Sequence, residues 1–274
     1  MTMPPAAAPP HLDAALSVRG LGVSFGGVRA LDGVDLDVRP GEIVGLIGAN
    51  GAGKTTLFDC VSGFVPGDGT VHVSGKDVTS LAPHLRARAG LGRSFQDARM
   101  FTSMTVLDTL RVASELVATR PPSVAATLLG VGGTAEHERE ATAKAMAVVE
   151  SFGLGAYRDK LIGELSTGTR RVVDLAALVL HRPTVILLDE PSSGIAQREA
   201  EALRPLLRQI RDDLGCALLV IEHDMPLLLG LAERLYALET GRIIASGQPD
   251  DVVADPRVVR SYLGDDPAAV GRSH

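Results

Sequence analysis

Aromatic residues are scarce in this chain: they make up 3% of its 274 residues, and tryptophan is absent. The core must therefore be filled by Val, Leu, Ile and Ala, which is typical of a buried parallel sheet covered by helices. A surplus of basic residues is also missing, because the formal net charge is −6. This charge argues against a protein that coats nucleic acid or anionic lipid, so we expect no nucleic-acid partner.

Cysteine is rare, and long apolar runs are missing. Cys60 and Cys216 stand in apolar stretches without paired spacing, which predicts reduced core thiols in a reducing cytoplasm rather than a disulfide or metal site. The longest apolar stretches, 172–180 and 225–232, are shorter than the roughly 20 residues that span a bilayer, so we expect a soluble chain. Residues 1–10 are rich in Pro and Ala without a basic segment leading into an apolar one, which predicts a disordered lead-in and no signal peptide.

Strand-like and helix-like patterns alternate along the first half of the chain. Residues 16–44 and 69–78 predict short strands joined by tight Gly and Asp turns. A buried strand is predicted at 43–47, followed by a glycine-rich loop and a helix from Lys54 to about Gly63, and another strand at 91–95. Helical spacing in 105–118 and 136–152, on either side of a Pro- and Gly-bearing linker at 121–133, predicts a helical subdomain.

The second half returns to the core sheet. A helix is predicted from Ser166 to just before Pro183. The apolar runs 184–188 and 216–221 flank an amphipathic helix, which predicts a right-handed strand–helix–strand unit. A hairpin at 235–246 and a short helical tail follow. The sequence therefore predicts an α/β fold with an antiparallel β part and a helical part.

A glycine-rich loop lies between the strand 43–47 and the helix that begins at Lys54. It satisfies the phosphate-loop pattern Gly-x4-Gly-Lys-Thr. Glycines let backbone N–H groups curl around phosphate oxygens, Lys54 places a positive charge at the β and γ phosphates, and the Thr55 hydroxyl suits Mg²⁺. The loop predicts a triphosphate site with ATP and Mg²⁺ as cofactors, and its binding residues are Gly48, Asn50, Gly51, Ala52, Gly53, Lys54, Thr55 and Thr56.

Polar residues follow three predicted strands, where the ligands of open α/β sheets bind. Asp189 is expected to hold the Mg²⁺ shell and Glu190 to polarise the attacking water, although a solvated acid pair at a strand end is the alternative. His223 suits a γ-phosphate contact or a switch, its alternative being a structural histidine. Gln96 follows the strand 91–95 and could reach the metal or its water, which position alone leaves open.

Together these residues resemble the ATP-binding cassette (ABC) ATPases, specifically those of branched-chain amino-acid importers, over residues 16–264. Residues 48–56 match the Walker A loop, 187–191 match Walker B with its catalytic glutamate, 94–96 resemble the Q-loop, and His223 resembles the switch histidine. Phe25 resembles the aromatic that stacks on adenine; the alternative is a core aromatic. The subgroup rests on residues 25–31, 221–225 and 255–264.

Two segments depart from this family. The signature segment 165–169 reads Leu-Ser-Thr-Gly-Thr, where the usual form is Leu-Ser-Gly-Gly-Gln. Ser166 and Gly168 remain, so we expect them to bind the γ-phosphate held by an opposite subunit, with efficiency reduced by Thr167 and Thr169. In the D-loop, Ala196 replaces the usual Asp or Asn, which predicts weaker communication between the two sites.

The resemblance implies a head-to-tail homodimer, or a heterodimer with a second ABC ATPase. Integral-membrane permease subunits would dock it at the cytoplasmic face of the plasma membrane, a solute-binding protein would act indirectly, and ATP would energise import of branched-chain amino acids or related small polar solutes. Residues 1–14 would be a lead-in, 15–264 the ATPase domain with 97–164 as helical subdomain, and 265–274 a flexible tail. Met100 and Phe101 are candidate permease contacts, or alternatively pack inside the helical subdomain.

Three other functions are consistent with parts of the sequence. A phosphate-loop GTPase or small-molecule kinase would want an Asn-Lys-x-Asp motif or an acceptor lid, and the sequence holds no Asn-Lys-x-Asp. A soluble ABC protein of translation or DNA repair would carry two cassettes or a long coiled-coil insert. A nucleotide-binding regulatory partner of low hydrolytic activity is the strongest alternative, because of Thr167, Thr169 and Ala196.

Overall fold

The computed structural model describes residues 13–95, 101–115, 134–195 and 197–263. An antiparallel sheet in the order β2-β1-β4-β5 forms the N-terminal layer, as predicted, but the prediction of short strands is wrong for β1 and β2, which have 10 and 11 residues because β2 continues through Asp32 and Gly33. Two consecutive glycines turn β1 into β2, with φ of 51° at Gly26 and 87° at Gly27, a region that favours glycine. The strands are β1 (Leu16–Phe25), β2 (Val28–Val38), β4 (Asp68–Val73) and β5 (Lys76–Asp77).

The second sheet runs in the order β10-β9-β3-β8-β7-β6. Its pairs from β6 to β9 are parallel, and only β10 is added antiparallel. Three strands in its middle are buried along their whole length, which confirms the predicted core strands to within one residue at each end. The strands are β3 (Ile43–Ile47), β6 (Leu91–Arg93), β7 (Val185–Asp189), β8 (Ala217–Ile221), β9 (Arg234–Glu239) and β10 (Arg242–Gly247).

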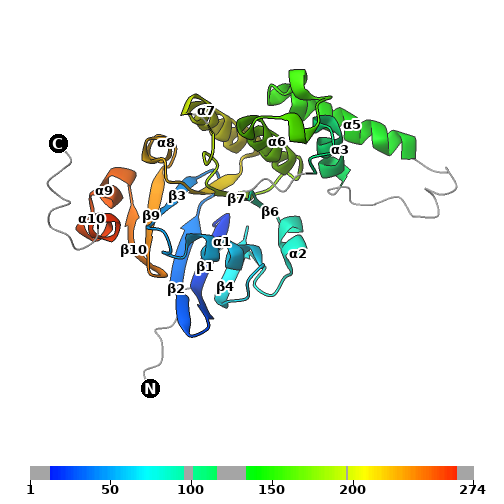
Figure 1. Cartoon of the computed structure of the whole chain (residues 1–274). Coiled ribbons are helices and arrows are strands. Elements are labelled where there is room, and N and C mark those ends of the chain that lie inside the picture. Colours follow the sequence, from blue (N-terminus) through cyan, green and yellow to red (C-terminus); the bar gives the residue numbers. More distant parts are fainter. Residues whose placement is uncertain (1–12, 96–100, 116–133, 196, 264–274) are drawn as a thin grey trace.

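Helices cover both faces of the parallel sheet (Figure 1). The helix α1 (Lys54–Ser62) packs Leu57 and Phe58 into a core cluster shared with both sheets. On the opposite face, α7 (Gln197–Leu214) and α8 (Met225–Leu229) build a second cluster. Because α7 connects the parallel neighbours β7 and β8, the predicted strand–helix–strand unit is present. The short helices α2 (Pro83–Arg88), α9 (Pro249–Ala254) and α10 (Pro256–Leu263) complete the layers.

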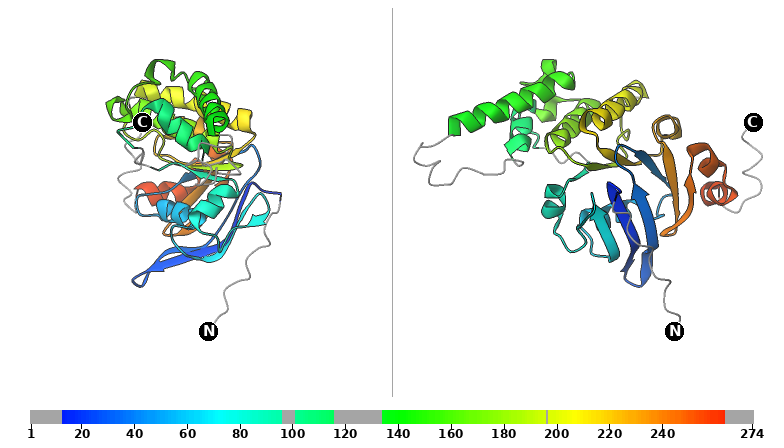
Figure 2. Two further views of the ribbon diagram at one scale, coloured as in Figure 1. Left: turned by 90° about the vertical axis from the view of Figure 1, so that its right-hand side faces the viewer. Right: turned by 180° about the vertical axis from the view of Figure 1, so that it is seen from behind.

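A third cluster joins the helices between β6 and β7, which extend from one end of the molecule while α9 and α10 lie at the other (Figures 1 and 2). Val106, Leu110, Val149 and Ile162 are fully buried in it. The predicted linker at 121–133 lies outside the described residues. These elements are α3 (Val106–Glu115), α5 (Thr134–Ser151), the 3₁₀ turns Gly155–Tyr157 and Ile162–Glu164, and α6 (Thr167–Leu180).

Both cysteines are buried and free, which confirms the prediction that they form no disulfide. Among the helices in the described part of the chain, none is long and apolar enough to cross a bilayer.

Candidate functional site

The glycine-rich loop leaves the carboxyl end of β3 and runs into α1. Gly51 and Gly53 have φ of 81° and 107°, which a side chain would strain. A Cβ at Gly53 would also lie 2.8 Å from the Ala30 carbonyl oxygen. At the start of the loop, a Cβ on Gly48 would lie 2.3 Å from the Leu238 carbonyl oxygen. The two sheets therefore hold both ends of the loop so closely that only glycine fits there.

Lys54 begins α1 beneath this loop and is 7% exposed. Its Nζ donates hydrogen bonds to the carbonyl oxygens of Gly48, at 2.7 Å, and Ala49, at 3.2 Å. Burial lowers the pKa of Lys54, and the carboxylates of Glu190 and Asp189 oppose that shift. The ammonium group is thus held by loop carbonyls next to the acidic strand end.

The remaining predicted loop residues differ in accessibility. Asn50, Gly51 and Thr55 are exposed, Thr56 is half-buried, and Ala52 is buried with its N–H donated to the Ala49 carbonyl. The Thr55 hydroxyl at the first turn of α1 is therefore accessible to a ligand above the loop.

Asp189 ends β7 and is 3% exposed. Burial raises the pKa of its carboxyl group, and the positive charge of Arg93 is the largest opposing effect. Arg93, on β6, lies 3.8 Å from Asp189 Oδ2 and forms a 2.8 Å ion pair with Asp59 of α1. Its guanidinium also lies 4.9 Å from the centre of the Phe95 ring. Sequence reasoning missed Arg93, because its partners come from two other elements.

Glu190 and His223 meet at the same edge of the sheet. The register pairs Asp189 with Ile221, so the residues that follow β7 and β8 are neighbours. The Glu190 Oε1 lies 3.1 Å from His223 Nε2. Glu190 has a left-handed φ of 48°, and its N–H donates to the Ile221 carbonyl. Their predicted proximity is present, and the unusual backbone at Glu190 fixes the direction of its carboxylate.

Glu222 is a buried carboxylate that sequence reasoning did not single out. It is 2% exposed and accepts hydrogen bonds from the Ser192 N–H at 2.7 Å and the Ser192 hydroxyl at 2.8 Å. The His223 N–H donates to it as well, at 3.1 Å. Glu222 therefore links Ser192, in the segment after Glu190, to His223, which contacts Glu190. Its signal in the sequence is an acid directly after a buried strand.

Arg171 of α6 connects the helical part with the sheet edge. It is 4% exposed and donates hydrogen bonds to the carbonyl oxygens of Phe95, at 2.7 Å, and Glu190, at 3.4 Å. Gln96, which follows Phe95, lies outside the described residues, as do Met100 and Ala196. The predictions for these three residues stay predictions.

The signature segment forms the N-terminus of α6. Ser166 is the N-cap, exposed, and its hydroxyl accepts the Thr169 N–H at 3.1 Å. The Thr169 hydroxyl lies 3.0 Å from the same oxygen, so Thr169 engages Ser166 twice. Gly168 is buried, and a Cβ there would lie 2.6 Å from Glu199 Oε2 of α7. A side chain at this position would displace the Glu199 carboxylate, which is the end of a flexible side chain, rather than the backbone of α7.

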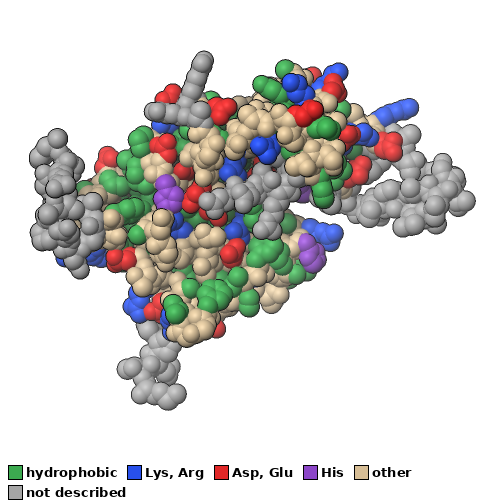
Figure 3. Space-filling model, viewed as in Figure 1, with side chains coloured by type: hydrophobic (Ala, Val, Ile, Leu, Met, Phe, Trp, Pro, Cys, Tyr) green, Lys and Arg blue, Asp and Glu red, His purple; other side chains and the backbone are tan. Residues whose placement is uncertain are grey.

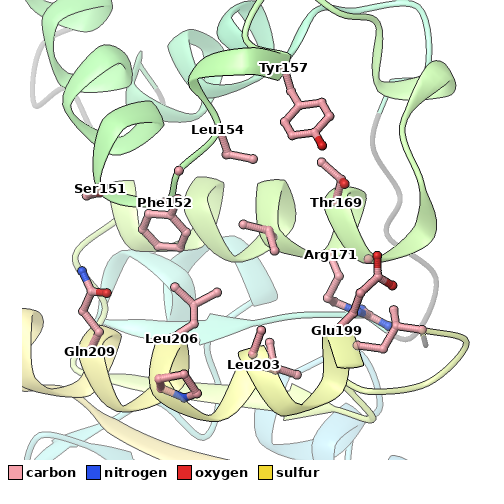
Figure 4. Close-up of a pocket in the computed structure, with 16 residues that line it drawn as sticks. Ser151, Phe152, Leu154, Tyr157, Thr169, Arg171, Glu199, Leu203, Leu206 and Gln209 are labelled. Carbon is pink, nitrogen blue, oxygen red and sulfur yellow. The ribbon is translucent and has the colours of Figure 1, made fainter. Parts of the chain in front are cut away.

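A hollow of about 450 Å³ lies beside this segment, between α6, α7 and the end of α5. Figure 4 shows Arg171 and Glu199 together at one end of it and Phe152 at the other. On the face in Figure 3, acidic and basic side chains of the described residues are interspersed, without a continuous basic band.

Phe25 and Phe101 are both exposed, at 50% and 71%. Because half of Phe25, at the end of β1, is exposed, the alternative that it is a core aromatic is wrong. The alternative that Phe101 packs inside the helical subdomain is wrong for the same reason. Both rings are accessible to a ligand or partner.

Comparisons with known proteins identify the family of the chain. Residues 31–193 match the family model described as ABC transporter, and 242–268 match the model described as branched-chain amino acid ATP-binding cassette transporter. The high-affinity branched-chain amino acid transport ATP-binding protein LivG of Escherichia coli K12 is 36% identical over 91% of this chain and 98% of its own. Its counterpart BraF of Pseudomonas aeruginosa is 34% identical over the same shares of both chains.

Solved structures give the same result. A nucleotide-free ATP-binding cassette from an ABC transporter is 30% identical, with a TM-score of 0.79 over 92% of this chain and 100% of that one. An ATP-binding cassette in its ADP conformation has a TM-score of 0.78 over 92% of this chain and 99% of that one, also at 30% identity.

Proposed function

The chain belongs to the ABC transporter ATP-binding family and is an ABC-type ATPase, and we propose that it energises import of branched-chain amino acids or related small polar solutes. The observation that carries the solute class is the similarity to LivG over almost the full length of both chains. The match of residues 242–268 to the branched-chain family model supports it from a second segment of the chain.

Within this function, each group at the sheet edge has a separate task. The phosphate loop binds the phosphates with Lys54, and Phe25 stacks on the adenine ring. Glu190 orients and polarises the attacking water, and His223, 3.1 Å from its carboxylate, contacts the γ-phosphate. Gln96, which follows β6 in the sequence, is proposed to act on the metal or its water.

The oxygen donors at this edge fit Mg²⁺. Asp189 is a buried carboxylate whose ion-pair partner Arg93 lies at 3.8 Å, outside direct hydrogen-bond distance. With the accessible hydroxyl of Thr55, it offers the oxygen donors that Mg²⁺ prefers, and the role of Gln96 at the metal stays a prediction from sequence. When bound, Mg²⁺ would supply positive charge to the β and γ phosphates.

Two chains are required for a complete site in this proposal. Ser166 and Gly168 of one subunit approach the ATP bound by the other, because the N-terminus of α6 offers the exposed Ser166 hydroxyl and the positive end of the helix dipole to an anion. Homodimers and heterodimers with a second ABC ATPase both satisfy this arrangement.

The force then passes to integral-membrane permease subunits. The exposed Phe101, close in sequence to Gln96, marks the docking segment. The chain would therefore work at the cytoplasmic face of the plasma membrane, with a solute-binding protein acting through the permease.

A reconstituted transporter tests the proposal. We would combine the chain with permease subunits of a branched-chain amino-acid importer and their solute-binding protein, and measure ATP turnover with and without leucine. We expect leucine-loaded binding protein to stimulate turnover, with Glu190→Gln as the inactive control. Stimulation by an unrelated solute, and by none of the branched-chain amino acids, would contradict the solute class.

A further inference from the structure

The C-terminal helix reaches the start of the phosphate loop. The hydroxyl of Tyr262, on α10, accepts a 2.6 Å hydrogen bond from the N–H of Gly48, although the two residues are 214 positions apart. No part of the ATPase chemistry described above uses Tyr262. The hydrogen bond between the last described helix and the nucleotide loop therefore needs a functional explanation.

The parallel sheet leaves the Gly48 N–H without a strand partner. The pairing of β3 ends at Leu46 opposite Ile221 on one side and at Ile47 opposite Ala237 on the other. Gly48 is the first residue beyond both ladders. A backbone N–H in a buried position needs another acceptor, and the Tyr262 hydroxyl supplies it.

The opposite side of Gly48 is held by the loop's cation. Lys54 Nζ donates to the Gly48 carbonyl at 2.7 Å, so Gly48 is bound through both its N–H and its C=O. Phosphate oxygens would compete with that carbonyl for the same ammonium group. A Cβ added at Gly48 would lie 2.3 Å from the Leu238 carbonyl oxygen, so Gly48 also has little room to move toward β9. A small shift of Gly48 is therefore transmitted to Lys54 and Tyr262 together.

Tyr262 belongs to a helix that packs against the core. Val258, one helical turn earlier on the same face of α10, is 3% exposed and belongs to the second core cluster. Val252 of α9 is 2% exposed in that cluster. Tyr262 itself is 43% exposed; its partial burial raises the pKa of its hydroxyl, and the Gly48 N–H opposes this shift. The hydroxyl thus remains protonated at neutral pH and is presented to Gly48 by a packed helix.

We propose that Tyr262 is a positioning residue of the phosphate loop, which fixes Gly48 for nucleotide binding and couples that binding to the C-terminal helix. This inference rests on the proposed ATP site. The coupling is reciprocal: if α10 stabilises the loop geometry that binds ATP, bound ATP stabilises the contact of α10 with the loop. Residues 242–268, which match the branched-chain family model, would then include an element of the nucleotide site.

The first test removes the hydroxyl oxygen of Tyr262. ATP and ADP affinities of the purified full chain and of Tyr262→Phe are measured by calorimetry. We expect affinity to fall about three- to tenfold, the range given by the net contribution of one hydrogen bond. Tyr236→Phe is the control, because the Tyr236 hydroxyl also accepts a backbone N–H, from Asp37 at 3.1 Å, together with a hydrogen bond from Arg234, but away from the loop. It should retain wild-type affinity.

The second test uses the intact chain. It contains three tyrosines and no tryptophan, so 3-fluorotyrosine labelling gives three ¹⁹F resonances, assigned through the single Phe variants. We expect ATP with Mg²⁺ to shift the Tyr262 resonance more than that of Tyr157. An unshifted Tyr262 resonance, or wild-type ATP affinity in Tyr262→Phe, overturns the inference and leaves the ATPase assignment intact. A wild-type chain that binds no ATP overturns both.

Discussion

The carboxyl edge of the parallel sheet and the N-terminus of α6 hold the two groups of residues that the proposed ATP site needs, and they are built differently. At the sheet edge, Lys54 and Asp189 are 7% and 3% exposed and are surrounded by loop carbonyls and charged neighbours. At the α6 terminus, Ser166 is exposed and bonded to Thr169, three residues further on. α1 and α6 also pack into different core clusters.

This difference indicates a division of labour. The sheet edge is preorganised by long-range packing within one chain, whereas the α6 terminus is fixed by local hydrogen bonds and faces outward. The first region retains the family residues, and the second carries Thr167 and Thr169 in place of the usual ones. Both differences are explained if the sheet edge of one chain binds ATP and polarises the attacking water, and the α6 terminus of another chain completes the site.

The largest effect is expected when the general base at the sheet edge is removed. Glu190→Gln keeps the shape of the side chain but abolishes its negative charge, so we expect ATP turnover to fall about 10²–10⁴-fold. ATP affinity should be retained, because Lys54 and the loop are unchanged. Turnover assays and calorimetry on the same preparation measure both. Wild-type turnover in this variant would show that the water is activated elsewhere.

The next largest effect tests how the sheet edge is held together. Glu222→Ala leaves the Ser192 N–H, the Ser192 hydroxyl and the His223 N–H without their acceptor. We expect the free energy of unfolding in urea to fall by about 2–3 kcal/mol. Glu222→Gln retains one carbonyl acceptor and should lose less. Equal stability of the Ala variant and the wild type would contradict the role of Glu222 as an anchor.

A smaller effect is expected at the α6 terminus. Thr169→Gln restores the usual family residue and removes the hydroxyl that lies 3.0 Å from Ser166 Oγ. Turnover should rise by about threefold, the size expected when one hydrogen bond of Ser166 is exchanged. Thr169→Val removes the hydroxyl without adding an amide, and so separates the two contributions. If neither variant changes turnover, Thr169 does not limit this half of the site.

The smallest effect concerns a buried acid on α6. Burial raises the pKa of Asp174 to about 6, partly opposed by Arg171. The folded chain therefore binds more protons than the unfolded chain between pH 4 and 6, and its stability falls as pH rises through that range. Asp174→Asn should flatten this dependence and stabilise the chain at pH 7 by about 1 kcal/mol. Thermal unfolding at pH 4 and 7 measures it, and an unchanged slope would exclude Asp174 as its source.

The elements that the sequence predicts well are those with a local signal. Continuous apolar runs predict β3, β7 and β8 because a strand buried on both faces leaves no polar alternation. The proximity of Glu190 and His223 follows from the same pattern, since parallel strands end at one edge. The short helices α2 and α8 lack the length for a helical period, and their recognition needs the surrounding packing.

The residues that the sequence does not reveal act across long separations. Arg93 pairs with Asp59 of α1 and Asp189 of β7, and the sequence around Arg93 indicates neither partner. Tyr262 belongs to a C-terminal segment that indicates only the subgroup, and its contact with Gly48 depends on how α10 packs. Local patterns therefore identify the groups that perform chemistry, and tertiary structure identifies those that position them.

The dependence of ATP turnover on chain concentration tests the central claim most directly. Turnover per chain would be measured across a dilution series while sedimentation gives the fraction of dimer. If the sheet edge is half of a site, turnover per chain rises in proportion to the dimer and approaches zero in the monomer. Constant turnover per chain in a strictly monomeric sample would contradict the account.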